Sequence, residues 1–295
     1  MFKSGTLWRE VVECSARAIR SGAQESITTE EVFVADAGVE FLVRVVSSLQ
    51  RKSASHAHRP LEAGLAQQSD NPFLPYEEAL LVAELSSTHV ALLNKYNVVA
   101  HHLLLVTRSF EEQLSPLSAA DFSAFTQCLS EVDGLGFYNA GAVAGASQRH
   151  KHLQLVRLPL ASRGSRIPIE PLLPTEAERG QIHRLTHLPF RHAFANLEVS
   201  PETNPTHAAR ELHQIYASML NELALARGDL TAPYNLLVTR SWMLLVPRLQ
   251  EHFETVSINA LGFAGALLVR TRQELELLAR RGPMTALGAV GAPPE

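Results

Sequence analysis

The apolar residues of the chain follow two periods, and these predict helices and strands. Helical spacing, or a capping residue before an apolar run, predicts helices at residues 6–20, 118–131 and 212–223 and from residue 271 onward. Short apolar runs predict strands at residues 39–46, 90–93, 103–106, 234–239, 242–247 and 265–270. This mixture of elements indicates an α+β protein.

Strict alternation predicts a further strand in HKHLQLV, residues 150–156. In an extended chain, both histidines, the glutamine and Val156 share one face, and the lysine and the two leucines share the other. The predicted strand therefore gathers two imidazoles and an amide on one face.

Segments without a clear period predict the connections between these elements. Residues 52–70 are rich in Ser, His, Ala and Gln, and we expect a loop that covers a site. Residues 133–147 predict a loop of glycine and alanine, and the residues after 282 predict a frayed tail. Four prolines mark residues 157–180 as a connection.

This connection suggests an N-terminal catalytic part, residues 1–180, and a C-terminal part, residues 181–295, that completes the site. The strings LLLVTRSF and NLLVTRSW are alike, one in each part. Either an ancient duplication or two similar buried strands would explain the likeness.

Composition narrows the class of protein. Hydrophobic residues make up 46% of the chain and charged residues 19%, as in a soluble globular protein. A net charge of −4 argues against a binder of duplex nucleic acid and leaves small anionic ligands open. Cys14 and Cys128 lack CxxC spacing, so a reducing cytoplasm is expected. Residues 258–269 are too short to span a membrane, and no membrane role is expected.

The polar face of residues 150–156 admits three interpretations. As packing alone, each buried and unpaired polar group would cost about 1–3 kcal/mol. As a metal site, two imidazoles face one ion, but residues 155–158 supply no further ligand, so no protein-held metal is expected. The isolated His89, His101, His102 and His187 are expected to be packed, hydrogen-bonded core groups.

The third interpretation is phosphate chemistry. The small side chains of NAGAVAGAS, residues 139–147, leave backbone N–H groups free to wrap phosphate oxygens, and Ser147 and Gln148 add donors. We expect the N–H groups of Gly145 and Ala146 to be exposed for this purpose. A neutral imidazole attacks phosphorus without prior deprotonation, provided that its other nitrogen carries the proton and donates it, often to a backbone carbonyl.

Several segments together resemble a known family. They are FLVRVVSSLQRK, NPFLPYEEALL, LLNKYNVVAHHLLLVTRSF, GFYNAGAVAGASQRHKHLQLV, NLLVTRSWMLLVPR and INALGFAGALLV. They are similar to the ATP adenylyltransferases, also called diadenosine tetraphosphate phosphorylases, of the histidine-triad superfamily, over about residues 39–284. His-x-His-x-Gln alone would also fit the galactose-1-phosphate uridylyltransferases.

The resemblance implies roles for individual residues. His152 would attack the α-phosphorus to form an adenylyl-histidine, with His150 and Gln154 in support. The implied substrate-binding residues are Lys52, Asn94, Lys95, Asn139, Gly145, Ala146, Ser147, Gln148, Asn259, Ala260, Leu261, Ala266 and Arg270. Ala266, Arg270 and Arg149 stand where the family commonly has methionine, lysine and proline.

The resemblance further implies a histidine-triad-like fold, with antiparallel sheets flanked by helices. The implied activity is reversible phosphorolysis of diadenosine tetraphosphate to ATP and ADP, with a divalent cation such as Mg²⁺ carried on the nucleotide. Nucleotides and phosphate are the expected partners, and nucleic acid and membranes are not. A hydrolase or uridylyltransferase with the same histidine, a dinucleotide-binding sensor and a metal-binding module remain alternatives, and the sequence leaves polyphosphate length, acceptor anion, direction and oligomeric state open.

Overall fold

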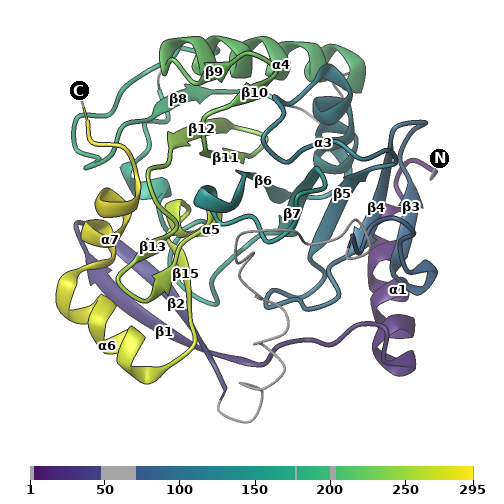
Figure 1. The fold of residues 1–295 in the computed structure, drawn as a ribbon, viewed down its shortest axis with the longest axis horizontal. Helices are drawn as coiled ribbons and strands as arrows, with labels where there is room; N and C mark the ends of the chain where they lie inside the picture. Colours follow the sequence, from purple (N-terminus) through teal and green to yellow (C-terminus); the bar gives the residue numbers. More distant parts are fainter. Residues whose placement is uncertain (1–2, 48–70, 177, 200–203, 295) are drawn as a thin grey trace.

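The computed structural model describes residues 3–47, 71–176, 178–199 and 204–294, and its centre is an eight-stranded sheet (Figure 1). All neighbouring strands in this sheet are antiparallel. Their order is β3 (Leu81–Glu84), β4 (His89–Leu93), β5 (Leu103–Thr107), β7 (His152–Arg157), β6 (Gly134–Ala140), β11 (Tyr234–Val238), β12 (Trp242–Pro247) and β8 (Ala193–Asn196). Strands from both predicted parts of the chain thus share one sheet, whereas the boundary at residue 180 itself stays a prediction.

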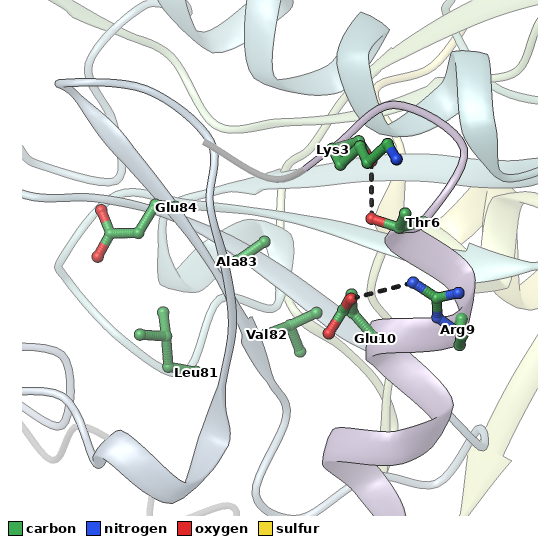
Figure 2. Close-up of a pocket in the computed structure, with 8 residues that line it drawn as sticks. All are labelled: Lys3, Thr6, Arg9, Glu10, Leu81, Val82, Ala83 and Glu84. Atoms are coloured by element: carbon green, nitrogen blue, oxygen red, sulfur yellow. Dashed lines mark hydrogen bonds and ion pairs between the residues drawn. The ribbon is translucent and has the colours of Figure 1, made fainter.

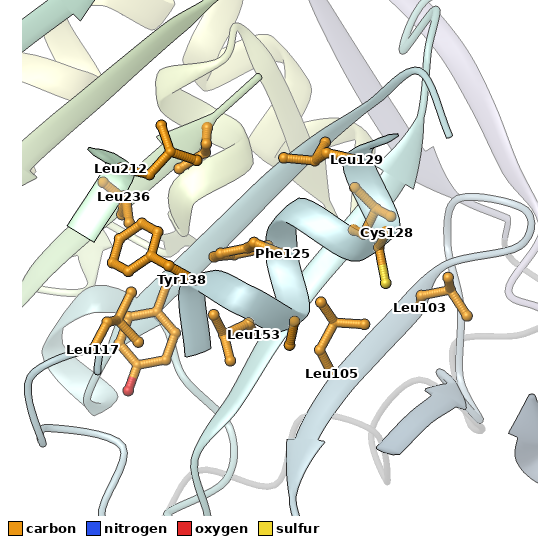
Figure 3. Packing of buried hydrophobic residues seen from close by; sticks show 14 of the residues in the cluster. Leu103, Leu105, Leu117, Phe125, Cys128, Leu129, Tyr138, Leu153, Leu212 and Leu236 are labelled. Carbon is orange, nitrogen blue, oxygen red and sulfur yellow. The ribbon is translucent and has the colours of Figure 1, made fainter. Parts of the chain in front are cut away.

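Helices cover one face of this sheet (Figure 1). They are α1 (Leu7–Ser21), α3 (Ala119–Glu131) and α4 (Pro205–Glu222). Leu153 and Leu155 of β7 belong to the hydrophobic cluster on this side, together with apolar residues of the helices (Figure 3). Ser118 begins α3 with a capping box shared with Asp121, as its sequence predicts.

A smaller sheet lies beside the C-terminal helices. Its order is β1 (Thr29–Asp36), β2 (Val39–Val46) and β15 (Ala266–Val269), followed in the chain by α6 (Arg272–Arg281) and α7 (Pro283–Val290). β1 and β2 are antiparallel, as expected, whereas β15 runs parallel to β2. The pairing joins a strand near the start of the chain to one near its end.

The remaining elements are short. They are η3 (Glu78–Leu80), η4 (Ala142–Ala144), η5 (Glu170–Leu172), β9 (Ala226–Arg227), β10 (Leu230–Thr231), β13 (His252–Phe253), β14 (Val256–Ser257) and α5 (Ala260–Phe263).

Two predicted connections are in fact regular structure. Residues Gly134–Ala140 form strand β6. The glycines of this strand do not form a turn but let helix α3 pack closely against it: a Cβ on Gly136 would lie 2.8 Å from a ring carbon of Phe125 on α3. The predicted frayed tail is helix α7, which begins at Pro283 and buries Leu287 and Val290.

The two similar strings occupy related places with different connections. LLLVTRSF supplies β5, which closes a hairpin begun by β4, whereas NLLVTRSW supplies β11, which opens a hairpin with β12. This difference favours two similar buried strands over a duplication as the cause of the likeness.

Candidate active site

The site lies on the face of β7 that points away from the helices. β7 begins at His152, and His150 precedes it in an isolated bridge with Glu112. Alternation holds as predicted: Leu153 and Leu155 join the helix-side core, and the intervening His152 and Gln154 take the opposite face. Phe73 and neighbouring apolar residues of β4 and β5 form a separate cluster on this face.

The geometry of His152 fixes which ring nitrogen carries the proton. Its Nδ1 lies 2.8 Å from the backbone oxygen of His150, and a carbonyl can only accept, so Nδ1 donates and Nε2 keeps its lone pair. Burial lowers the pKa of His152 to about 4, although this hydrogen bond acts in the opposite direction. His152 is therefore neutral at pH 7 and carries a nucleophilic nitrogen.

His150 is held by the protein itself. Its Nε2 donates to the backbone oxygen of Thr107 at 2.8 Å, and its Nδ1 lies 3.0 Å from the side-chain nitrogen of Asn71. The rings of Phe73 and Phe110 pack against it, with centroids 5.6 Å away. Its side chain is thus occupied within the protein, and its backbone oxygen orients His152. Asn71, Thr107 and the two phenylalanines lie in segments that carry the resemblance, but they were not singled out, because their spacing in the sequence does not show that they surround His150.

His102 extends the site along β5. It precedes the strand and lies on the face of Leu104, the residue that pairs with Gln154. Its Nδ1 lies 3.2 Å from the side-chain nitrogen of Asn94, so Nε2 carries the proton, and no described residue accepts it. Burial lowers the pKa of His102 to about 4, with Gln154 opposing and His152 adding to the shift. His102 is a packed, hydrogen-bonded core group as expected, and its second ring nitrogen has no partner among the described residues.

The other isolated histidines differ among themselves. His89 is a core group as expected, bonded to Asp121 at 2.9 Å and to Thr88. His101 packs edge-on against Trp8 and is half-buried. His187 is exposed and bonds to a backbone carbonyl, so the expectation of a core position is wrong for it, because the segment around it is an irregular surface connection.

The Asn-Lys pair lies at the end of β4. The side-chain oxygen of Asn94 accepts from the N–H of Tyr96 at 3.1 Å, which shapes the turn. Lys95 is partly exposed and pairs with Glu77 at 2.8 Å, a contact that raises the pKa of the lysine. Lys52 and the predicted loop at residues 52–70 lie outside the described residues.

The small-residue loop differs from its prediction in two respects. Asn139 lies on β6, and its side-chain oxygen accepts from the side chain of Asn235 at 2.8 Å and from the N–H of Ala260 at 2.9 Å. The N–H groups of Gly145 and Ala146 are not free, because they donate to carbonyls of their own loop at residues 142 and 141. The loop turns back on itself, which uses these donors internally.

Ser147 and Gln148 follow this turn and are more open. The side chain of Ser147 is exposed and that of Gln148 is half-buried. Among the hydrogen bonds of the described residues, none has the backbone N–H of either residue as its donor. Of the four residues expected to supply donors, Gly145 and Ala146 therefore have occupied N–H groups, whereas the N–H groups of Ser147 and Gln148 have no acceptor among the described residues.

The late Asn-Ala-Leu segment meets this loop. A Cβ on Gly145 would lie only 2.8 Å from the Cβ of Asn259, so the two segments touch where glycine leaves room. Asn259 caps α5 through the N–H of Leu261, and Ala260 is fully buried. The structure thus brings two distant predicted segments together.

Ala266 and Arg270 lie farther along the chain, at the smaller sheet. Ala266 begins β15 and is half-buried, and Arg270 follows the strand, is exposed and donates its backbone N–H to Glu274 at 2.6 Å. Neither residue is on the eight-stranded sheet that carries His152.

Two cavities among the described residues lie away from this site. A cavity of about 500 Å³ lies between α1 and β3, where the charged Arg9 and Glu10 pair with each other (Figure 2). Another, of about 800 Å³, lies beside Trp8 and Arg157. Neither is lined by the polar face of β7. Within the described ranges, no three His, Cys, Asp or Glu side chains are grouped to hold a metal, and no helix is long and apolar enough to cross a membrane.

Comparisons with known proteins identify the family of the chain. The sequence model of the Ap4A phosphorylase N-terminal domain, where Ap4A is diadenosine tetraphosphate, matches residues 1–175, and that of the ATP adenylyltransferase C-terminal domain matches residues 186–293. Diadenosine 5',5'''-P1,P4-tetraphosphate phosphorylase 2 of Saccharomyces cerevisiae is 31% identical over 246 residues, which cover 72% of each chain. Protein APA1 of the same yeast is 28% identical over 235 residues, 71% of each chain.

A solved structure shares the whole fold. The crystal structure of yeast Ap4A phosphorylase Apa2 in complex with AMP has a TM-score of 0.81 and 25% identity, and the match covers 100% of this chain and 99% of that one. The predicted histidine-triad-like α+β fold is thereby confirmed. The chain belongs to the Ap4A phosphorylase family of ATP adenylyltransferases, which are nucleotidyltransferase enzymes.

Proposed function

We propose that this protein catalyses the reversible phosphorolysis of Ap4A to ATP and ADP through an adenylyl group on Nε2 of His152. The hydrogen bond from Nδ1 of His152 to the backbone oxygen of His150, 2.8 Å long, carries this proposal. It supports a ring in which one nitrogen holds the proton and the other is free to attack.

The reaction proceeds in two displacements at the same phosphorus. Nε2 attacks the α-phosphorus of Ap4A, a bond to the bridging oxygen breaks, and ATP leaves. The imidazole gains positive charge as the bond forms, and the donation from Nδ1 to the carbonyl of His150 stabilises that charge. Inorganic phosphate then attacks the adenylyl group, which leaves Nε2 as ADP and restores the lone pair. The reverse sequence makes Ap4A from ATP and ADP.

The surrounding residues would hold the polyphosphate. The N–H groups of Ser147 and Gln148, which have no acceptor among the described residues, would donate to its oxygens, and the Nε2–H of His102 would be a further donor. Lys95 would exchange Glu77 for a phosphate, with Lys52 and Arg270 as additional cations. A divalent cation such as Mg²⁺ would arrive with the nucleotide as part of the substrate. A cytoplasmic location stays a prediction.

Incubation with Ap4A, with and without inorganic phosphate, tests this function directly. With phosphate, ATP and ADP should form in equal amounts and turnover should continue. Without phosphate, at most one ATP per protein molecule should form quickly, and peptide mass analysis should find the adenylyl group on His152. Sustained AMP production would establish a hydrolase, binding without any product would establish a sensor, and adenylate on another residue would refute the nucleophile.

A further inference from the structure

Strands β6 and β7 separate next to the nucleophile. Their ladder runs from Gly134 opposite Arg157 to Phe137 opposite Gln154. The same register would next place Asn139 opposite His152, but the backbone groups of these two residues bond to a side chain from elsewhere in the chain. That side chain is the carboxamide of Gln113, which is 2% exposed.

Three hydrogen bonds place this carboxamide between the two strands. Its oxygen accepts from the backbone N–H of His152 at 2.9 Å. Its nitrogen donates to the backbone oxygens of His152, at 3.2 Å, and of Asn139, at 2.9 Å. A backbone N–H can only donate and a carbonyl can only accept, so this pattern fixes the orientation of the amide. Gln113 thus satisfies both backbone groups of the nucleophile.

Gln113 is itself held from two sides. Its backbone N–H donates to the oxygen of Arg149 at 2.7 Å, and its backbone oxygen accepts from the hydroxyl of Tyr138 at 2.6 Å. Tyr138 is fully buried on β6, and burial raises the pKa of its hydroxyl well above the usual range, so it remains a donor. The carboxamide therefore has little freedom to move, and neither has the backbone of His152.

From these contacts we infer that Gln113 is a positioning residue, which replaces the missing strand pairing and holds the backbone of His152 so that Nε2 stands in line with the α-phosphorus. The inference rests on the proposed function. A glutamine side chain spans a wider gap than a direct backbone bond does, so the two strands can separate here while the backbone groups of His152 keep their hydrogen bonds. Displacement of a reacting group by about 1 Å can cost about a hundredfold in rate.

Gln113→Met tests this role, because methionine has a similar length and removes all three hydrogen bonds. The rate at which adenylyl-His152 forms from Ap4A in a single turnover should fall on the order of a hundredfold. The dissociation constant for AMP should change by less than about threefold, because Gln113 makes no contact assigned to the nucleotide. Leu212→Ala is the control, since it opens a cavity on α4 in the helix-side core (Figure 3) and should lower stability without this selective loss of rate.

Tyr138→Phe provides a second, milder test that keeps the fold if Gln113→Met does not. It removes only the hydroxyl that holds Gln113, and the same rate should fall by about three- to tenfold with AMP binding unchanged. A wild-type rate in both variants, an equal loss of AMP affinity, or the same selective loss in Leu212→Ala would overturn the positioning role. Absence of adenylate on His152 in the wild-type protein would instead overturn the proposed function.

Discussion

The two faces of β7 differ in how their buried polar groups are paired. On the helix side, Lys151 is 1% exposed, and its ammonium group bonds to Glu111 at 2.6 Å, to the backbone of Pro116 and to Asp121. On the other side, His152 is 4% exposed, and its Nε2 has no hydrogen-bond partner among the described residues, nor has the Nε2–H of the neighbouring His102.

This difference shows how a buried polar residue that serves the structure can be distinguished from one that serves ligand binding. A charged group that has all its partners within the fold, such as Lys151, serves the structure, even beside the catalytic residues. A neutral group held through one atom, with the other left open, is prepared for a ligand. Burial alone does not separate the two cases, whereas the inventory of partners does.

The largest expected effect comes from the open face, by which we mean the side of β7 on which His152 and Gln154 lie. His152→Ala removes the proposed nucleophile and should lower turnover of Ap4A by on the order of a thousandfold or more, while AMP binding measured by calorimetry persists. His150→Ala should cost less, because the backbone oxygen that orients His152 remains. Near-normal turnover of pure His152→Ala would show that the open face does not carry the chemistry.

Substitutions on the closed face, the helix side on which Lys151 lies, should change stability rather than catalysis. Asp121→Ala leaves Lys151 and His89 short of a buried partner and should lower the free energy of unfolding by about 3–5 kcal/mol in urea titrations. Turnover per folded molecule should stay within about twofold. The exposed Asp229→Ala is the control, with a change of less than about 0.5 kcal/mol. A selective loss of adenylyl transfer in Asp121→Ala would erase the contrast between the faces.

Acid should destabilise the open face. His152 and His102 have pKa values lowered to about 4 in the fold, against about 6.5 in an unfolded chain, so the unfolded state binds more protons between these limits. Their contribution is fully present above pH 6.5 and is lost as the pH falls toward 4, on the order of 3 kcal/mol for each histidine. His102→Leu should flatten the loss in pH-dependent urea titrations, and an unchanged slope would contradict the assignment.

The smallest effect concerns the rim of the site. Lys95→Ala should lower kcat/KM about tenfold, because a charge-assisted bond to phosphate contributes about 1.5–3 kcal/mol. Glu77→Ala frees the lysine from its ion pair and should leave kcat/KM equal or slightly higher. Unchanged kinetics in Lys95→Ala would show that this lysine only forms the exposed ion pair with Glu77 and does not bind phosphate.

Local patterns in the sequence predict much of the arrangement on the two faces of β7. Alternation in residues 150–156 predicts both faces of β7, and the capping serine predicts where α3 begins. A backbone carbonyl was expected to accept the proton of the attacking histidine, and the structure shows that this carbonyl belongs to His150, two residues away. The motif therefore encodes its own tautomer.

Contacts between distant segments cannot be predicted from such patterns. The role of Asn139 as a bridge to Ala260 and the place of Gln113 between two strands depend on which strands become neighbours, and no period in the chain records that. The N–H groups of Gly145 and Ala146 were wrongly expected to be exposed, because composition does not reveal how the small-residue loop folds back on its own carbonyls.

The parallel pairing of β2 with β15 has a consequence for synthesis on the ribosome. Leu42 pairs with Ala266, 224 residues later (266 − 42), and a ribosome adding about 5–20 residues per second needs on the order of 10–45 s to make that interval. Until then, the edge of β2 that β15 will cover stays open to other strands or to a chaperone. A nascent chain therefore carries His152 well before the part of the fold that includes β15 exists, and the enzyme matures only with its last elements.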